Sequence, residues 1–181
     1  MSSREELKAI RKKIRQDDRF QQFLKNFRGN PAYQIPFDDH HEELQRLHTT
    51  RLTRELKRKK SRSFPEKALD AMLQDQATRS RCAEILGECS KISSAMDRTL
   101  SKLRDYLLSE YAGYMKIVGT VGERKAFIEA VMRDFYDFFD EVKTLEKSAA
   151  IVIEDIDKAN YMYKNLVELI KVLSRPEQVM L

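Results

Sequence analysis

Metal-ligating side chains gather most densely at residues 38–48, where the sequence DDHHEE is followed by His48. Imidazole and carboxylate groups could hold a divalent metal if three or more of them converged on one point. On a helix, however, His41 and His48 lie two turns apart, and Leu44 and Gln45 occupy the positions between them. The spacing therefore indicates the acidic, capped start of a helix, and we expect neither a metal nor any other cofactor.

Carboxylates also cluster at residues 154–157, in the sequence Glu-Asp-Ile-Asp. Asp155 and Asp157 are two residues apart, so on a helix they point in different directions and are not a paired general acid and base. They are either solvated or in polar contact with another helix, because Asp is a poor helix former. The sequence also lacks a glycine-rich phosphate loop, a paired-cysteine metal motif and a nucleophile elbow. We therefore expect a protein that is not an enzyme.

The densest positive charge lies between residues 51 and 62, where one glutamate accompanies seven basic residues: Arg51, Arg54, Lys57, Arg58, Lys59, Lys60 and Arg62. Two interpretations stay open for this basic segment. It is either a solvated helix face or a site for polyanions, where neutralised phosphates give sequence-independent and salt-sensitive affinity. Tyr33 and Phe64 could then stack on unpaired bases. The segment has too little apolar surface for a helix that lies on a membrane.

Charge is distributed unevenly over the 181 residues. Residues 1–63 hold 17 Lys and Arg against 9 Asp and Glu, a net charge of +8, whereas residues 64–181 carry a net charge of −3. Charged residues make up 35% of the chain, above the roughly 25% that is usual for a compact domain. Such a composition favours thin, elongated helical structure. Five Gly and four Pro are too few for the many turns of an all-β fold.

The elements that carry these residues are predicted to be helices throughout. Residues 1–63 form a basic N-terminal helical region, interrupted by an extended proline-containing linker at 29–37. A helical period then persists from Glu66 to about Ile117, and the glycine-containing turn at 118–122 follows. After the turn, fourteen non-polar or aromatic residues recur in alternating steps of three and four: Ile128, Val131, Phe135, Phe138, Val142, Leu145, Ala149, Val152, Ile156, Ala159, Tyr163, Leu166, Ile170 and Leu173.

A 3.5-residue repeat sustained over seven heptads predicts a left-handed coiled coil. The short turn requires the two long helices to run antiparallel. The predicted fold class is therefore all-α, with a long antiparallel two-helix coiled-coil hairpin over residues 64–174 and a C-terminal tail at 175–181.

The apolar face of the second long helix is wider than a two-helix hairpin can cover. Its additional residues are Phe127, Met132, Phe139, Ile153, Met162 and Leu169. Either the N-terminal helices pack across this face or a second copy of the chain does. We expect a homo-oligomer that uses these six residues as an oligomer or partner interface.

Several observations bear on the compartment. No apolar stretch is long enough for a transmembrane helix, and the basic N-terminus lacks the apolar core of a secretory signal. Cys82 and Cys89 share a helix about 10 Å apart, too far for a disulfide. Buried, reduced thiols and a cytoplasmic location are therefore expected, with no membrane partner.

Residues 103–173 resemble the UvsY-type recombination mediators of tailed phages. The resemblance rests on GTVGERKAF (Gly119 to Phe127) and on IEDIDKANYMYKNL (Ile153 to Leu166). It implies a small, helical, oligomeric protein that binds single-stranded DNA and helps to load a recombinase, in the host cytoplasm if a phage encodes it. The family's own N-terminal half has no match in this chain and no motif fixes the DNA-contacting residues, so the resemblance assigns no site residues. We expect a non-catalytic, nucleic-acid-associated accessory protein, and the alternative is a structural assembly protein, scaffold or adaptor that binds other proteins through its helical faces.

Overall fold

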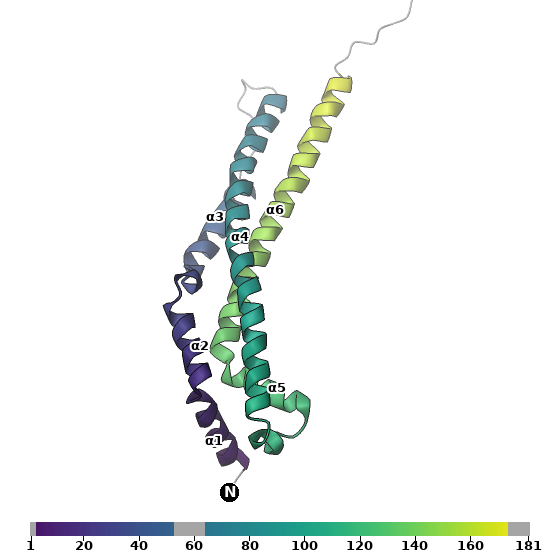
Figure 1. Ribbon diagram of the computed structural model, residues 1–181. Helices are drawn as coiled ribbons and strands as arrows, with labels where there is room; N and C mark the ends of the chain where they lie inside the picture. Colours follow the sequence, from purple (N-terminus) through teal and green to yellow (C-terminus); the bar gives the residue numbers. More distant parts are fainter. Residues whose placement is uncertain (1–2, 53–63, 174–181) are drawn as a thin grey trace, which may run out of the picture. The chain divides into compact units, whose positions relative to one another are not determined.

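The computed structural model describes residues 3–52 and 64–173, and within these ranges all regular structure is helical. The all-α prediction is therefore confirmed (Figure 1). The chain forms two compact units, Met1–Pro36 with Cys89–Thr144 and Phe37–Glu88 with Leu145–Leu181. Residues 1–63 were predicted as one N-terminal region, and their described part contributes two α-helices to the first unit and one to the second. Each unit also takes one part of each of the two longest helices.

The first unit begins with α1 (Ser3–Arg15) and α2 (Asp18–Gly29). Acidic residues in the first turn of α1 and basic residues in its last turn complement the helix dipole. Asp17 caps α2, because its carboxylate accepts a hydrogen bond from the backbone N–H of Phe20 at 2.9 Å. The 3-10 turn η1 (Pro31–Tyr33) lies in the predicted linker.

An aromatic cluster holds α2 against the first part of α6 (Arg133–Leu173). The rings of Phe20, Phe23 and Phe27 meet the Phe135 ring edge-on, with centroids 6.2, 4.7 and 4.9 Å away. Such edge-to-face pairs add to the free energy gained by burying apolar area. This packing places N-terminal residues over the seam that the heptad repeat defines.

The long helix predicted from Glu66 to about Ile117 ends earlier than expected at its C-terminus. It is α4 (Phe64–Glu110), and the 3-10 turn η2 (Tyr114–Val118) follows. The chain leaves the helix where Tyr111 is buried with its hydroxyl bonded to Asp17, and where Met115 becomes fully buried. Tertiary packing therefore overrides a helical period that the sequence alone would continue.

The predicted turn is present, but the helix after it is not continuous. Gly119 has a φ of 89°, and Thr120 and Glu123 form a capping box at the start of α5 (Val121–Val131). Met132 then interrupts the helix before α6 begins (Figure 1). The interruption lets Ile128, Val131 and Met132 all enter the core of the first unit. Neither Gly nor Pro marks this break, so the sequence pattern gave no sign of it.

The second unit contains α3 (Phe37–Leu52) with the first part of α4 and the second part of α6. Its core is small and includes Leu44, Cys82, Ile85, Val152 and Ile156. Cys82 here and Cys89 in the first unit are buried and form no disulfide, as the sequence predicted. In the described parts of the chain, no helix combines the length and apolar content that crossing a membrane requires.

The heptad seam of α6 is buried over only part of its length. Within the second unit, Leu145, Ala149, Val152 and Ile156 are buried at steps of four, three and four. The same register continues toward Leu173, but Leu166 and Leu173 are exposed. The last turns of α6 therefore have no packing partner among the described residues that would match their apolar side.

Candidate interaction surfaces

Of the seven basic residues predicted to bind polyanions, one lies within the ranges that the structure describes. Arg51 lies at the end of α3, and its side chain is 12% exposed. The other six residues lie outside the described ranges: Arg54, Lys57, Arg58, Lys59, Lys60 and Arg62. The structure therefore places the first cation of the segment in the packed part of the second unit.

Arg51 connects three helices of the second unit. Its guanidinium donates to the backbone carbonyl of Asp155 on α6 at 2.6 Å and lies 3.4 Å from the carboxylate of Asp75 on α4. Asp75 is only 2% exposed, so a buried charge is neutralised by an opposite charge. Sequence reasoning did not single out Asp75. It lies seven residues before Cys82, so extending the apolar period of α4 by one heptad would have shown a carboxylate at a seam position.

The carboxylates at residues 154–157 also contact another helix. Both oxygens of Asp157 accept from the Arg79 guanidinium, at 2.8 and 3.1 Å, and these hydrogen bonds lower the pKa of Asp157. For Asp157, this matches the second of the two interpretations of the acidic cluster. At Asp155 the contact with Arg51 is made by the backbone carbonyl and not by the carboxylate.

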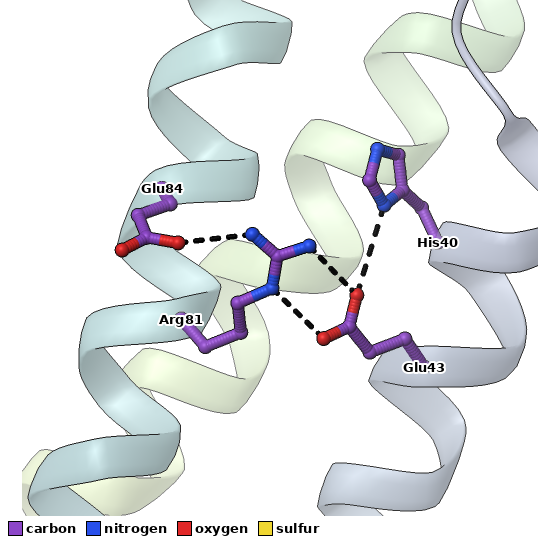
Figure 2. Close-up of polar contacts among 4 residues, drawn as sticks. All are labelled: His40, Glu43, Arg81 and Glu84. Atoms are coloured by element: carbon purple, nitrogen blue, oxygen red, sulfur yellow. Dashed lines mark hydrogen bonds and ion pairs between the residues drawn. The ribbon is translucent and has the colours of Figure 1, made fainter.

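A second arginine joins α3 to α4 (Figure 2). Arg81 of α4 donates from Nε and Nη2 to the two oxygens of Glu43 at 2.8 and 2.9 Å, and from Nη1 to Glu84 at 2.9 Å. The hydrogen bonds from Arg81 lower the pKa of Glu43 and raise that of the guanidinium. The two-pronged geometry fixes the rotation of α3 about its axis, because both oxygens must face one planar group.

The histidines of the acidic helix start are dispersed over this helix. His40 Nδ1 lies 3.8 Å from Glu43, whereas His41 and His48 line a separate shallow groove against Ser148 and Val152. Within residues 3–52 and 64–173, no three His, Cys, Asp or Glu side chains are grouped so that they could hold a metal ion. The helix begins at Phe37, so Asp38 and Asp39 lie in its first turn, and Glu43 joins α3 to α4 through Arg81.

The six residues predicted as an interface fall into three environments. Met132 is 0% exposed in the core of the first unit, and Phe127 and Phe139 are partly buried against that core. Ile153 is half-buried in the second unit and lines a groove of about 480 Å³ with Leu86, Ala150 and Tyr161. Met162 and Leu169 are 60% and 54% exposed. N-terminal helices and the first unit's own core thus cover three of the six residues, and the exposed ones lie toward the end of α6.

An apolar stripe on the last turns of α6 consists of Met162, Leu166, Leu169 and Leu173, which recur at steps of four, three and four. All four are exposed, and Leu173 is 75% exposed. Leu69 and Leu73, near the start of α4, are also exposed in the second unit, although the sequence pattern did not identify them. Contiguous exposed apolar residues usually mark an interaction site.

Comparison of this chain with protein-family models, with curated proteins and with solved structures found no match.

Proposed function

We propose that this chain is a non-catalytic accessory protein that binds single-stranded nucleic acid and self-assembles through its long helices. The observation that carries the proposal is charge polarity, since residues 1–63 have a net charge of +8 and the remainder a net charge of −3. A helical scaffold has no need for such an excess of cations on one third of its length. Polyanion binding does need it, because affinity grows with the number of phosphates neutralised.

The proposed assembly element is an antiparallel hairpin formed by α4 and α6. Its support comes from the heptad repeat, from the Arg79–Asp157 pair that joins the two helices and from the buried seam between Leu145 and Ile156. The apolar stripe at Met162, Leu166, Leu169 and Leu173 is the surface that we assign to a second copy. Oligomers that carry several basic segments would bind one strand at several points and gain affinity through multivalency.

Recombination is the process that we assign to this protein, and the support is the resemblance of residues 103–173 to UvsY-type mediators. A mediator holds single-stranded DNA without reading its bases, so its contacts go to phosphates. The basic segment at residues 51–62 has the composition for that role.

A structural assembly protein, scaffold or adaptor is the second candidate. The observation that favours it is the pairing of the arginines in the second unit, where carboxylates of the fold neutralise Arg51, Arg79 and Arg81. On this alternative, the apolar stripe of α6 binds another protein and the basic segment is a solvated face.

An anisotropy titration with a fluorescein-labelled oligothymidylate separates the two candidates. We expect the unmodified protein to bind at low salt, and we expect the combined change of Arg54, Arg58 and Lys60 to Glu to abolish binding. Each lost contact should reduce the slope of log K against log salt by about 0.7. The control changes Lys91, Lys147 and Lys164 to Glu, three exposed residues whose reversal alters the net charge equally.

Equal losses in the two variants would show that affinity follows net charge and not the basic segment. Flat titration curves for the unmodified protein at about 0.05 M and about 0.15 M salt would remove the nucleic-acid proposal and favour the scaffold.

A further inference from the structure

The outer side of α1 carries a row of cations that the sequence analysis did not single out. Arg4, Lys8, Arg11, Lys12 and Arg15 are all exposed, and their spacing of four, three, one and three places them on one side of the helix. The opposite side carries Ile10 and Ile14, which are buried in the core of the first unit. We call these five cations the α1 basic face.

Three members of the α1 basic face have no acidic partner within the described residues. No carboxylate there forms an ion pair with Lys8, Lys12 or Arg15, in contrast to the arginines of the second unit. Burying a cation against a carboxylate would leave less charge for an external ligand. Lys8, Lys12 and Arg15 retain that charge.

Other cations near α1 have structural contacts and mark the limits of the face. The Lys13 ammonium lies 4.0 Å from the centre of the Tyr114 ring, and Arg19 lies 4.5 Å from that of Tyr106. Arg11, at the edge of the face, lies 5.9 Å from the Phe127 ring. These contacts attach α1 and α2 to the rest of the first unit, so the α1 basic face lies on a helix that is held in place.

The segment that contains α1 and α2 carries a net charge close to that of residues 51–62. Residues 1–29 contain nine Lys and Arg against four Asp and Glu, a net charge of +5, and residues 51–62 have a net charge of +6. Arg4 and Arg15 are separated by about 16 Å along the helix axis, at 1.5 Å per residue. This length can contact several successive phosphates of a nucleic-acid strand.

We propose that the α1 basic face is a second binding site for the phosphate backbone of single-stranded DNA, in addition to residues 51–62. The inference rests on the proposed function and extends it to a defined surface. A phospholipid headgroup offers the same charge, but a membrane-bound helix inserts its apolar side, and here Ile10 and Ile14 are occupied in the core. The exposed side of α1 is rich in cations, which fits a strand of phosphates.

The test reverses the three unpaired cations in one variant, Lys8→Glu, Lys12→Glu and Arg15→Glu, and leaves Arg11 on Phe127. We expect binding of the labelled oligothymidylate to weaken about tenfold or more, and the salt slope to fall by about 2, or 0.7 for each lost contact. The Lys91, Lys147 and Lys164 variant is the matched control and should lose much less. A second variant with Gln at residues 8, 12 and 15 disturbs the helix dipole less, and it decides the question if the Glu variant does not fold by circular dichroism.

Four outcomes are distinct. Selective loss in the α1 variants supports the inference. Unchanged binding in the α1 variants, with loss in the Arg54, Arg58 and Lys60 variant, overturns it and leaves the proposed function intact. Absence of binding by the unmodified protein overturns both proposals. Binding to phosphatidylserine vesicles but not to the oligonucleotide also overturns the inference, because the ligand would then be a lipid surface.

Discussion

Asp17 organises the first unit through a single carboxylate. It caps α2 through Phe20, and its Oδ2 atom also accepts hydrogen bonds from the hydroxyls of Tyr106 and Tyr111, each at 3.0 Å. The cap could be predicted from an Asp at the end of one helical period and the start of another. The two tyrosines could not, since they lie 89 and 94 residues away in the sequence and only the tertiary fold brings them to Asp17.

Stability of the protein should depend on pH through Asp17. Burial alone would raise the pKa of this carboxyl, but the hydrogen bonds from Phe20, Tyr106 and Tyr111 leave it below its ordinary value of 3.8. A lowered pKa means that the stabilisation is present above that value and is lost as pH falls through the pKa of the folded protein. We expect Asp17→Asn to cost about 1–3 kcal/mol at neutral pH and to flatten the acid side of the stability curve. Urea denaturation at several pH values measures this.

Asp18→Asn is the control for that experiment, because Asp18 is exposed beside the cap. An identical acid dependence in Asp17→Asn and the unmodified protein would contradict the prediction.

At the alkaline end, burial and the hydrogen bond to Asp17 raise the pKa of Tyr111 to about 12. Stabilisation by Tyr111 is therefore present below pH 10, its ordinary pKa, and is lost as pH rises through about 12.

The ion pair between Arg51 and Asp75 gives a second prediction for single residues. Asp75→Ala leaves the Arg51 guanidinium without its charged acceptor in a packed environment, so we expect a loss of about 3–5 kcal/mol. Replacing both partners, as Arg51→Met with Asp75→Leu, should recover much of that loss, because no buried charge then remains unpaired. Chemical denaturation followed by circular dichroism compares the three proteins. If the double variant were no more stable than Asp75→Ala, the loss would not come from an unpaired buried charge, and the prediction would be wrong.

Among the elements, α4 contains one residue that weakens it without an evident contact. Gly87 lies in the interior of this 47-residue helix, and a Cβ added there would meet no atom within 4 Å. We expect Gly87→Ala to stabilise the protein by about 0.5–1 kcal/mol through helix propensity. Gly119→Ala provides the contrast. It should destabilise, because the φ of 89° is unfavourable with a side chain and the added Cβ would clash with Glu123.

Thermal unfolding followed by circular dichroism checks both glycine variants under the same conditions. If Gly87→Ala lowered the melting temperature, the prediction would be wrong.

The limits of sequence prediction are clearest at the level of elements. The capping box of α5 follows from Thr120 and Glu123, which are local, and the helices follow from periodicity. The end of α4 at Glu110 and the break at Met132 follow from burial of Tyr111, Met115 and Met132 in one core. Such burial depends on residues far apart in the sequence, so no local pattern contains it. The same reason explains why the pairing of Asp75 with Arg51 was missed.

For the whole molecule, we predict concentration-dependent self-association. Met162→Glu with Leu169→Glu should lower the mass measured by light scattering without lowering the melting temperature, because both side chains are more than half exposed. A change at Phe127 or Met132 is unsuitable as a test, since both contribute to the first unit's own packing. A strictly monomeric unmodified protein at micromolar concentration would contradict the assembly proposed for α6.

The way in which the two units are built from separate segments of the chain also has a consequence for biosynthesis. Each unit combines an early segment with a late one, 1–36 with 89–144 and 37–88 with 145–181. While the ribosome is still translating, α2 must wait for Phe135 before its aromatic cluster can close, and α3 must wait for Asp155. Non-local contacts of this kind slow folding and leave apolar surface uncovered on the nascent chain. The N-terminal helices are therefore the segments of this chain that are exposed longest to chaperones and proteases during synthesis.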